Sequence, residues 1–324
     1  MLANAIWALL SPDRPDITGE VQYVLDGGAL IQRIPWTRGA TYKEICTVYT
    51  SYVKKKFGEA IVVFDGYDGT STKDMTHRRR AKGQASATVT FTEDMQFTIK
   101  KEQFLTNKTN KQKFINMLGD QLENSKCKVH HAPGDADLLI VQKAVESAAI
   151  VNTVLVGDDT DLLILLCYHA SLDSHSIFFR PEPKKTTKNP RVWDIQVVME
   201  QLGPEVCSHI LFLHAVLGCD TTSRLYGIGK GTSLKKFKSS IHFREQARAF
   251  DVQSASSEDV IAAGEQVLVS IYNGRHGEDL DSLRYKQFCQ KIATNTSHVQ
   301  PQTLPPTSAA LIEQIGKERL IFLT

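Results

Sequence analysis

Aspartates that could do chemistry together follow four short apolar stretches of this chain. These stretches, which we expect to be strands, are residues 21–25, 61–64, 128–132 and 154–156. The acids that follow them are Asp26, Asp65, Asp135, Asp137, Asp159 and Asp161. In an open parallel α/β sheet the carboxyl ends of the strands form the ligand-binding edge, so the acids would meet there. One strand ending in Asp means little, because Asp is a common turn residue and helix cap; the repetition carries the inference.

Carboxylates gathered at one edge repel one another. Two unit charges about 4 Å apart interact by roughly 4 kcal/mol at an effective dielectric near 20, so the cluster requires protonated acids or bound cations. Oxygen ligands without His or Cys favour Mg²⁺ or Mn²⁺, and paired ions of this kind promote in-line attack on a phosphodiester. We therefore expect a metal-dependent phosphodiesterase with two ions per site. Simple helix capping by Asp135 is the alternative there, and Asp158 is a weaker candidate that could only cap the next turn.

The composition is that of a globular protein. The chain has 324 residues, 42% hydrophobic and 23% charged, enough for one large α/β domain or a core with an appendage. Its net charge of +2 is unevenly distributed, with basic residues dominating at 73–113, 180–191 and 224–248. An acidic edge within basic surroundings fits a protein that holds metal ions and a polyanion together.

Scattered cysteines and the absence of a long apolar run indicate an intracellular protein. The six cysteines lie mostly in apolar stretches, as reduced thiols do. Cys127 could form a zinc corner with His130 and His131, but no second ligand pair follows, which favours strand packing. The apolar run 3–10 is too short to span a membrane, and we expect a helix packed on the core. We expect a nuclear location.

Hydrophobic periodicity supplies the elements that must position the acids. It predicts a crossover helix over 42–56, a β-hairpin over 89–99, and helices over 104–122 and 135–149. A further strand at 176–179 is followed by helices over 195–202, 204–217 and 258–292. We expect a core at 1–220 with a basic insertion at about 66–124, a helical region at 221–292, a linker at 293–308 and a tail at 309–324.

Two basic segments are candidates for binding phosphate groups. The insertion after Asp65 carries Arg78, Arg79, Arg80 and Lys82, for which a solvated charged face is the alternative. The second segment comprises Gly227, Gly229, Lys230, Gly231, Lys235 and Lys236. Glycines before a helix let backbone N–H groups approach a phosphate, although such a pattern alone is more often a tight turn. Its place shortly after Asp220, a seventh acid, strengthens the functional interpretation.

The order of these motifs resembles the flap endonuclease (XPG-type) superfamily of structure-specific 5′ nucleases, which have a PIN-like core. The resemblance covers most of residues 20–240. It implies a doubly wound parallel sheet in three α/β/α layers with a helix-two-turn-helix appendage. The stretches that carry it are Val24-Leu25-Asp26, Val63-Phe64-Asp65-Gly66, Ala132-Pro133-Gly134-Asp135-Ala136-Asp137, Gly157-Asp158-Asp159-Thr160-Asp161, and Leu217-Gly218-Cys219-Asp220 leading into Gly227-Ile228-Gly229-Lys230.

The resemblance also assigns roles to residues. It implies that the seven acids, Asp220 included, bind two Mg²⁺ ions, and that the glycine segment holds duplex DNA through backbone phosphates and a monovalent cation such as K⁺. The basic stretch after Asp65 matches an arch helix whose Lys and Arg polarise the scissile phosphate. Lys73 and Arg79 are nearest by spacing, with Arg78 or Arg80 as alternatives.

Departures from the family pattern point to its diverged, asteroid-like members. Asp135 and Asp137 stand where the family usually has Glu, the Met-Gly start is absent, and no sliding-clamp motif is evident. We expect a structure-specific DNA nuclease of the 5′ flap type acting on branched or duplex DNA, with no membrane partner. A catalytically inactive nucleic-acid-binding scaffold and a PIN-type ribonuclease, with RNA as substrate, are the alternatives.

Overall fold

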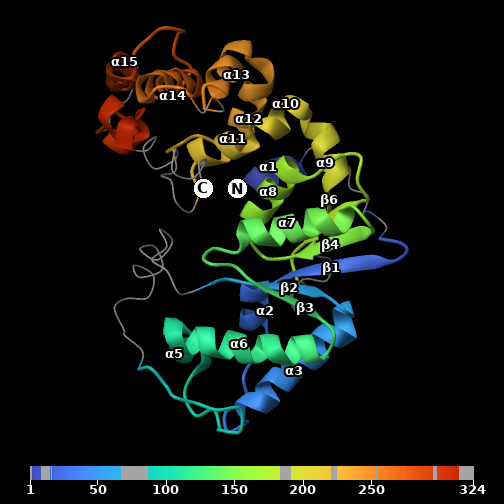
Figure 1. The fold of residues 1–324 in the computed structure, drawn as a ribbon. Coiled ribbons are helices and arrows are strands. Elements are labelled where there is room, and N and C mark those ends of the chain that lie inside the picture. Colours follow the sequence, from blue (N-terminus) through green and yellow to red (C-terminus); the bar gives the residue numbers. More distant parts are fainter. Residues whose placement is uncertain are drawn as a thin grey trace. The chain divides into compact units, whose positions relative to one another are not determined.

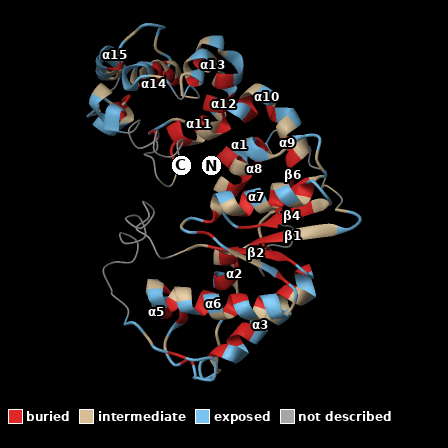
Figure 2. Ribbon diagram, viewed as in Figure 1, coloured by how far each residue is buried: buried red, intermediate tan, exposed pale blue. Residues whose placement is uncertain are grey.

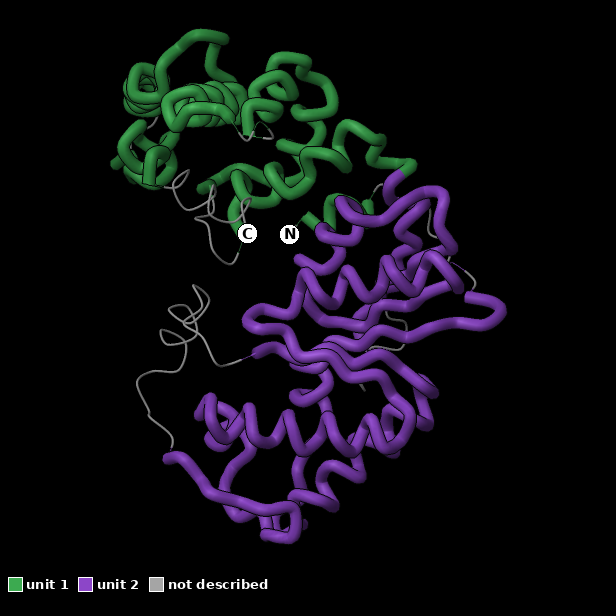
Figure 3. Tube along the Cα trace, in the orientation of Figure 1, with its two compact units in different colours: residues 1–10, 200–324 green, residues 11–199 purple. Residues whose placement is uncertain are grey.

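A computed structural model describes most of the chain in two compact units. The described residues are 2–8, 15, 17–66, 87–182, 191–219, 225–250, 252, 254–294 and 298–313. Residues 11–199 form an α/β unit, and residues 1–10 and 200–324 form a helical unit (Figure 3). The α/β unit ends at residue 199. We expected the nuclease core to extend to residue 220.

The α/β unit is built on a six-stranded sheet with the order β3-β2-β1-β4-β5-β6. The first five strands are parallel, and β6 pairs antiparallel with β5. The strands are β1 (Val21–Asp26), β2 (Ile61–Phe64), β3 (Lys128–His131), β4 (Asn152–Val156), β5 (Ile177–Arg180) and β6 (Trp193–Asp194). The expected doubly wound parallel sheet is confirmed, and every expected strand that delivers an acid is present.

Helices cover both faces of this sheet, giving three layers (Figure 1). One layer holds α2 (Gly27–Arg33), α3 (Tyr42–Phe57), α5 (Lys101–Thr106) and α6 (Lys108–Asn124). The other holds α7 (Asp137–Ala148) and α8 (Thr160–His169), while α9 (Ile195–Leu202) follows β6. The strand β2 is buried throughout, as its continuous apolar sequence requires. Figure 2 shows the buried residues along the strands and the inner sides of the helices.

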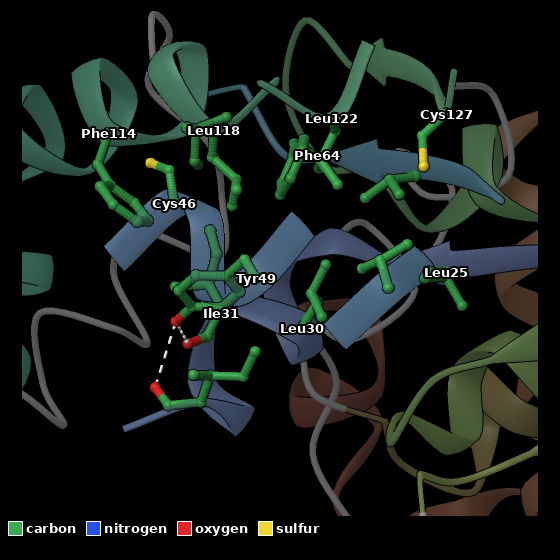
Figure 4. Packing of buried hydrophobic residues seen from close by; sticks show 14 of the residues in the cluster. Leu25, Leu30, Ile31, Cys46, Tyr49, Phe64, Phe114, Leu118, Leu122 and Cys127 are labelled. Carbon is green, nitrogen blue, oxygen red and sulfur yellow. Dashed lines mark hydrogen bonds between the residues drawn. The ribbon is translucent and has the colours of Figure 1, made fainter. Parts of the chain in front are cut away.

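Local sequence explains where the crossover helix α3 begins and how it fixes α2. Thr41 and Glu44 form a reciprocal capping box at its start, and Gly58 ends it with φ of 66°. On its buried face the Tyr49 hydroxyl donates to the carbonyl oxygens of Ile31 and Ile34 at 2.6 and 3.3 Å (Figure 4). These bonds satisfy carbonyls at the C-terminal end of α2, the short helix that begins directly after Asp26.

The expected hairpin over 89–99 is wrong. The described residues 87–100 form no strand; instead Phe97 N donates to Ala40 O at 2.8 Å, and Tyr42 N donates to Met95 O at 3.1 Å. The alternating aromatic side chains are buried for another reason, because Phe91 stacks on Tyr42 with ring centroids 4.2 Å apart. The backbone of residues 93–97 therefore forms hydrogen bonds with residues 39–43, at the start of α3, in place of the strand pairing expected within the segment 89–99.

Other differences are breaks within long helical patterns. The pattern over 104–122 divides into α5 and α6 at Asn107, whose side chain accepts from Asn110 N and so caps α6. The pattern over 204–217 divides into α10 (Pro204–Ser208) and α11 (Ile210–Val216), and the pattern over 258–292 into α14 (Ser257–Ile271) and α15 (Leu280–Thr294). Apolar spacing persists across these breaks, so it did not reveal them.

The helical unit contains α1 (Leu2–Trp7) as well as α10 to α15, with α12 (Lys230–Ser239) and α13 (Ile241–Arg248) between the elements already given. A Cβ added at Gly231 would lie 3.3 Å from the Ala5 side chain, so α1 packs against the start of α12. The expected N-terminal helix is present, and it packs within the helical unit.

We expected a linker at 293–308. Side chains of α15 bind the described residues 303 and 305 of this stretch. Lys291 Nζ donates to Thr303 O at 2.9 Å, within the 3₁₀ helix η1 (Pro301–Thr303), and Arg284 donates to the carbonyl of Pro305. All six cysteines are thiols outside any disulfide bond, and four of them, Cys46, Cys127, Cys167 and Cys207, are buried, as expected for packing roles. Among the described helices, none is long and apolar enough to cross a membrane.

Candidate active site

The sheet order places the acids around a topological switch point. The chain runs outward from β1 through β2 to β3, then returns to the other side of β1 with β4. Ligands of doubly wound sheets bind outside the carboxyl ends of the strands at such a point. Asp26 ends β1, and Asp159 follows β4 by three residues, so the two acids flank the switch point.

Asp26 is a buried acid at this edge with a perturbed pKa. Its carboxylate caps α2 by accepting from Ala29 N at 3.0 Å. Burial raises the pKa of Asp26 to about 6, the hydrogen bond from Ala29 opposes the rise, and the negative charges of Asp65 and Asp159 add to it. A raised pKa in a carboxyl with acidic neighbours is typical of catalytic and metal-binding sites.

The carboxylates of Asp26, at the end of β1, and Asp65, directly after β2, both lie close to Gly28. A Cβ at this position would lie 3.2 Å from Asp26 Oδ1 and 3.4 Å from Asp65 Oδ2. The missing side chain thus leaves both carboxylates facing the same backbone. The other oxygen of Asp65, Oδ1, accepts from Ala136 N at 3.1 Å, which joins β2 to the loop after β3. Any larger residue at 28 would crowd both acids.

The remaining acids form two similar turns at the starts of helices. Asp135 Oδ1 accepts from Asp137 N at 3.1 Å before α7, and Asp159 Oδ1 accepts from Asp161 N at 2.9 Å at the start of α8. Each bond leaves the second oxygen of the first acid outside that turn. Asp135 is not the cap of α7, since the cap position is Ala136, which makes no side-chain cap bond; Asp135 instead accepts from the N–H of Asp137, the first residue of the helix. Asp158 does not cap α8; its carboxylate lies 3.8 Å from Arg33 Nη2.

The donor chemistry fits a hard divalent cation with few direct protein ligands. Within the described ranges, no three His, Cys, Asp or Glu side chains form a group that could hold a metal ion. Mg²⁺ is commonly bound through one or two carboxylates, with water and substrate phosphate completing its octahedron. Asp26 and Asp65, together beside Gly28, supply such a pair.

Lys111 is a basic residue of the site that sequence reasoning missed. Burial lowers the pKa of Lys111, and the charges of Asp65 and Asp26 oppose this, so its ammonium lies within the field of both acids. It lies near the start of α6, whose first turn contains no acidic residue. Cations are unfavourable near a helix N-terminus, but the start of α6 at Lys108 was not apparent from the sequence, so no local pattern marked Lys111.

Several predicted residues fall outside the described residues. These are Lys73, Arg78, Arg79, Arg80, Lys82 and the seventh acid, Asp220. Their roles stay predictions. The hypothesis of an arch over the site likewise concerns residues that the structure does not describe.

The glycine segment belongs to the helical unit and leads into a helix as predicted. Gly227 has φ of 72°, and Gly229 is the N-terminal cap of α12. The nearby lysines differ in their surroundings. Lys230 Nζ donates to Gly218 O at 2.5 Å, and Lys236 Nζ donates to Ile271 O at 2.7 Å and to Asn273 Oδ1 at 2.6 Å, whereas Lys235 is exposed.

Comparisons with known proteins place the chain by shape. No family model and no curated protein matches the sequence. Its structure is similar to that of T5 D15 protein co-crystallised with metal ions, with a TM-score of 0.46 and 14% identity over 93% of this chain and 88% of that one. It is also similar to the catalytic core of Rad2 in complex with DNA substrate, with a TM-score of 0.44 and 14% identity over 94% of this chain and 92% of that one.

A third similar structure is the Holliday junction-resolving enzyme GEN1 in complex with product DNA and Mg²⁺, with a TM-score of 0.39 and 14% identity. That match covers 97% of this chain and 64% of GEN1. The likeness is one of fold. At these identities and TM-scores it carries no argument about activity, which must come from the residues at the sheet edge.

Proposed function

We propose that this protein is a divalent-metal-dependent nuclease that hydrolyses phosphodiesters of branched or duplex DNA. The observation that carries the proposal is the meeting of the Asp26 and Asp65 carboxylates beside Gly28, at the carboxyl edge of the sheet next to the switch point between β1 and β4. Asp159 lies close enough to raise the pKa of Asp26. A binding surface for a polyanion gains nothing from such acids, since they repel phosphate, unless cations intervene.

The chain's own residues have distinct roles in this proposal. Asp26 and Asp65 would hold one divalent ion, and Asp135, Asp137, Asp159, Asp161 and Asp220 would complete the sites directly or through water. Bound Mg²⁺ or Mn²⁺ supplies Lewis acidity to the phosphodiester and to the attacking water. The Lys111 ammonium, which lies within the field of Asp65 and Asp26, would stabilise developing charge on a phosphate oxygen. Lys73 and Arg79 would serve the same purpose from the basic insertion.

The glycine segment supports DNA as the substrate class. Backbone N–H groups at the start of α12, after Gly229, are suited to the phosphates of a duplex. The proposal therefore favours cleavage next to a duplex, of the 5′ flap type, over cleavage of single-stranded RNA.

The test is cleavage of end-labelled flap, fork, blunt duplex and single-stranded DNA with matched RNA, in Mg²⁺, in Mn²⁺ and in EDTA. We expect metal-dependent cutting near a junction that Asp159→Ala reduces by on the order of 10³-fold. Asp173→Asn is the matched control, because Asp173 is an exposed acid in the turn before β5, at the amino edge of the sheet, and it should cut normally.

Other outcomes would replace the proposal. A folded protein that binds DNA equally in EDTA and with Asp159→Ala, and cuts nothing, is the inactive scaffold. Cutting of RNA alone identifies the ribonuclease.

A further inference from the structure

A second charged cluster lies beside the acid site and centres on Glu182, two residues after β5. Glu182 is only 6% exposed. Lys56 Nζ lies 2.6 Å from its Oε1, the Tyr52 hydroxyl donates to the same oxygen, and Arg33 Nε lies 3.4 Å from Oε2. A buried carboxylate with this many partners is held firmly in place, because each partner offsets part of its desolvation cost.

Arg33 is the member of this cluster that reaches the acid site. Its Nη2 donates to the Glu182 carbonyl at 2.7 Å and lies 3.8 Å from Asp158 Oδ1. Asp158 directly precedes Asp159, which caps α8. Because Glu182 holds the guanidinium at both Nε and Nη2, Nη2 has a defined position relative to the turn after β4.

The same residue is connected to Asp26 through α2. Arg33 is the last residue of this seven-residue helix, and Asp26 is its N-terminal cap. Asp26 and Glu182 also line one small cavity of about 10 Å³, which is about the size of a single water. One guanidinium thus contacts the loops after β4 and β5 from the helix that begins at Asp26.

The energy of the Arg33–Asp158 contact is not its main contribution. The Asp158 side chain is 43% exposed, and ion pairs that are this accessible to water contribute little to the stability of a fold. What the contact can set is the position of the turn that carries Asp159. Residues that orient metal ligands commonly change metal affinity by about 10- to 100-fold when they are replaced.

We infer that Arg33 is a positioning residue of the acid site, which holds the Asp158–Asp161 turn in register with Asp26 by anchoring it to the buried Glu182. The inference rests on the proposed function, because it assumes that Asp26 and Asp159 bind the metal ions.

The test is Mn²⁺ binding to the full chain without nucleic acid, followed by electron paramagnetic resonance, for wild type, Arg33→Gln and Lys56→Gln. Lys56→Gln is the matched control, since it also removes a close cationic partner of Glu182 but has no contact with Asp158. We expect Arg33→Gln to weaken Mn²⁺ binding by about 10-fold or more and Lys56→Gln to leave it unchanged, while both lower the melting temperature.

Asp158→Asn provides a second route to the same answer, because its side chain is largely exposed and the variant should fold. We expect it to weaken Mn²⁺ binding in the wild type and to have a clearly smaller effect in the Arg33→Gln background, as residues acting through one contact are not additive. In cleavage assays, Arg33→Gln should raise the Mg²⁺ concentration required for half-maximal rate and leave the KM for DNA unchanged.

Equal Mn²⁺ affinities for wild type and Arg33→Gln, with equal losses of melting temperature for Arg33→Gln and Lys56→Gln, would overturn the inference and leave Arg33 as a fold-stabilising residue. Full additivity of Arg33→Gln and Asp158→Asn would also overturn it. If wild type binds Mn²⁺ normally in either case, the proposed function stands. A wild type that binds no Mn²⁺ overturns both.

Discussion

In the α/β unit the carboxylates of Asp26 and Asp65 face the same glycine, whereas in the helical unit Lys230 and Lys236 are bonded to carbonyl oxygens at the ends of helices. Lys236 Nζ satisfies acceptors at the C-terminus of α14, where the helix dipole favours a cation. Asp26 and Asp65 are close enough to repel, and the charge of Asp65 contributes to the raised pKa of Asp26.

The difference separates charges that stabilise the fold from charges that oppose it. A lysine that caps a helix needs no ligand to explain it, so its presence in a basic segment is weak evidence for DNA binding. Acids held together against their repulsion do need an explanation, since proteins keep strained or destabilising groups mainly where function requires them. Substitutions should therefore have opposite effects in the two units.

The largest expected effect is the loss of activity in Asp26→Asn. Asparagine keeps the cap on α2 and removes the charge, so we expect cleavage to fall by on the order of 10³-fold while the free energy of unfolding stays equal or rises. Single-turnover kinetics and urea denaturation measure the two quantities. Retained cleavage, or a clear loss of stability, would contradict the assignment of Asp26 as a repelled metal ligand.

The pH dependence of the free energy of unfolding tests the contribution of the Asp26 carboxylate separately. The folded-state pKa of Asp26 is raised to about 6 from 3.8, so its stabilising contribution is fully present below pH 3.8 and is lost as the pH rises through about 6. In EDTA, wild type should match Asp26→Asn at the low end of this window and be less stable by about 1–3 kcal/mol above it. Urea titrations of both proteins at pH 4.5 and pH 7.5 measure the change, and a constant difference would contradict it.

Much of the acid edge could be predicted because each acid ends its strand or follows it within a few residues in the sequence. A strand that ends in Asp26 and another followed by Asp159 meet at the carboxyl edge whenever the sheet is parallel, whatever the strand order. The order β3-β2-β1-β4, which puts the switch point between these two acids, requires long-range pairing that no local pattern specifies.

Contacts between distant segments account for what was not predicted. Lys111 lies 46 positions after Asp65 in the sequence, and it reaches the acid edge through the packing of α6. The segment at 89–99 has the alternation of a hairpin, but its backbone pairs with residues 39–43. Likewise, the lysines of α12 have the spacing of a phosphate site, and only the fold shows that Lys236 is bonded to another helix.

In the helical unit, Lys236→Met should reduce stability. The substitution leaves acceptors at Ser270, Ile271 and Asn273 without the ammonium, which we expect to cost about 1–2 kcal/mol in the free energy of unfolding. Binding of duplex DNA should keep its salt dependence, since no phosphate contact is removed. Denaturant unfolding and fluorescence anisotropy over a range of salt concentrations test both statements, and a shallower salt dependence would instead make Lys236 a DNA contact.

The smallest expected effect, and the sharpest contrast, is that of the neighbouring Lys235→Met. Lys235 is exposed on the same helix, so its loss should change the free energy of unfolding by less than about 0.5 kcal/mol. If the start of α12 holds a DNA backbone, this substitution should weaken binding equally for all duplex sequences and reduce the slope of log K against log salt by about 1. The same anisotropy titration measures that slope, with Lys236→Met as the matched control one position along the chain. An unchanged slope for Lys235→Met would mean that Lys235 takes no part in holding DNA, and the phosphate-binding hypothesis would then lose its exposed lysine in the glycine segment and depend mainly on the backbone N–H groups after Gly229.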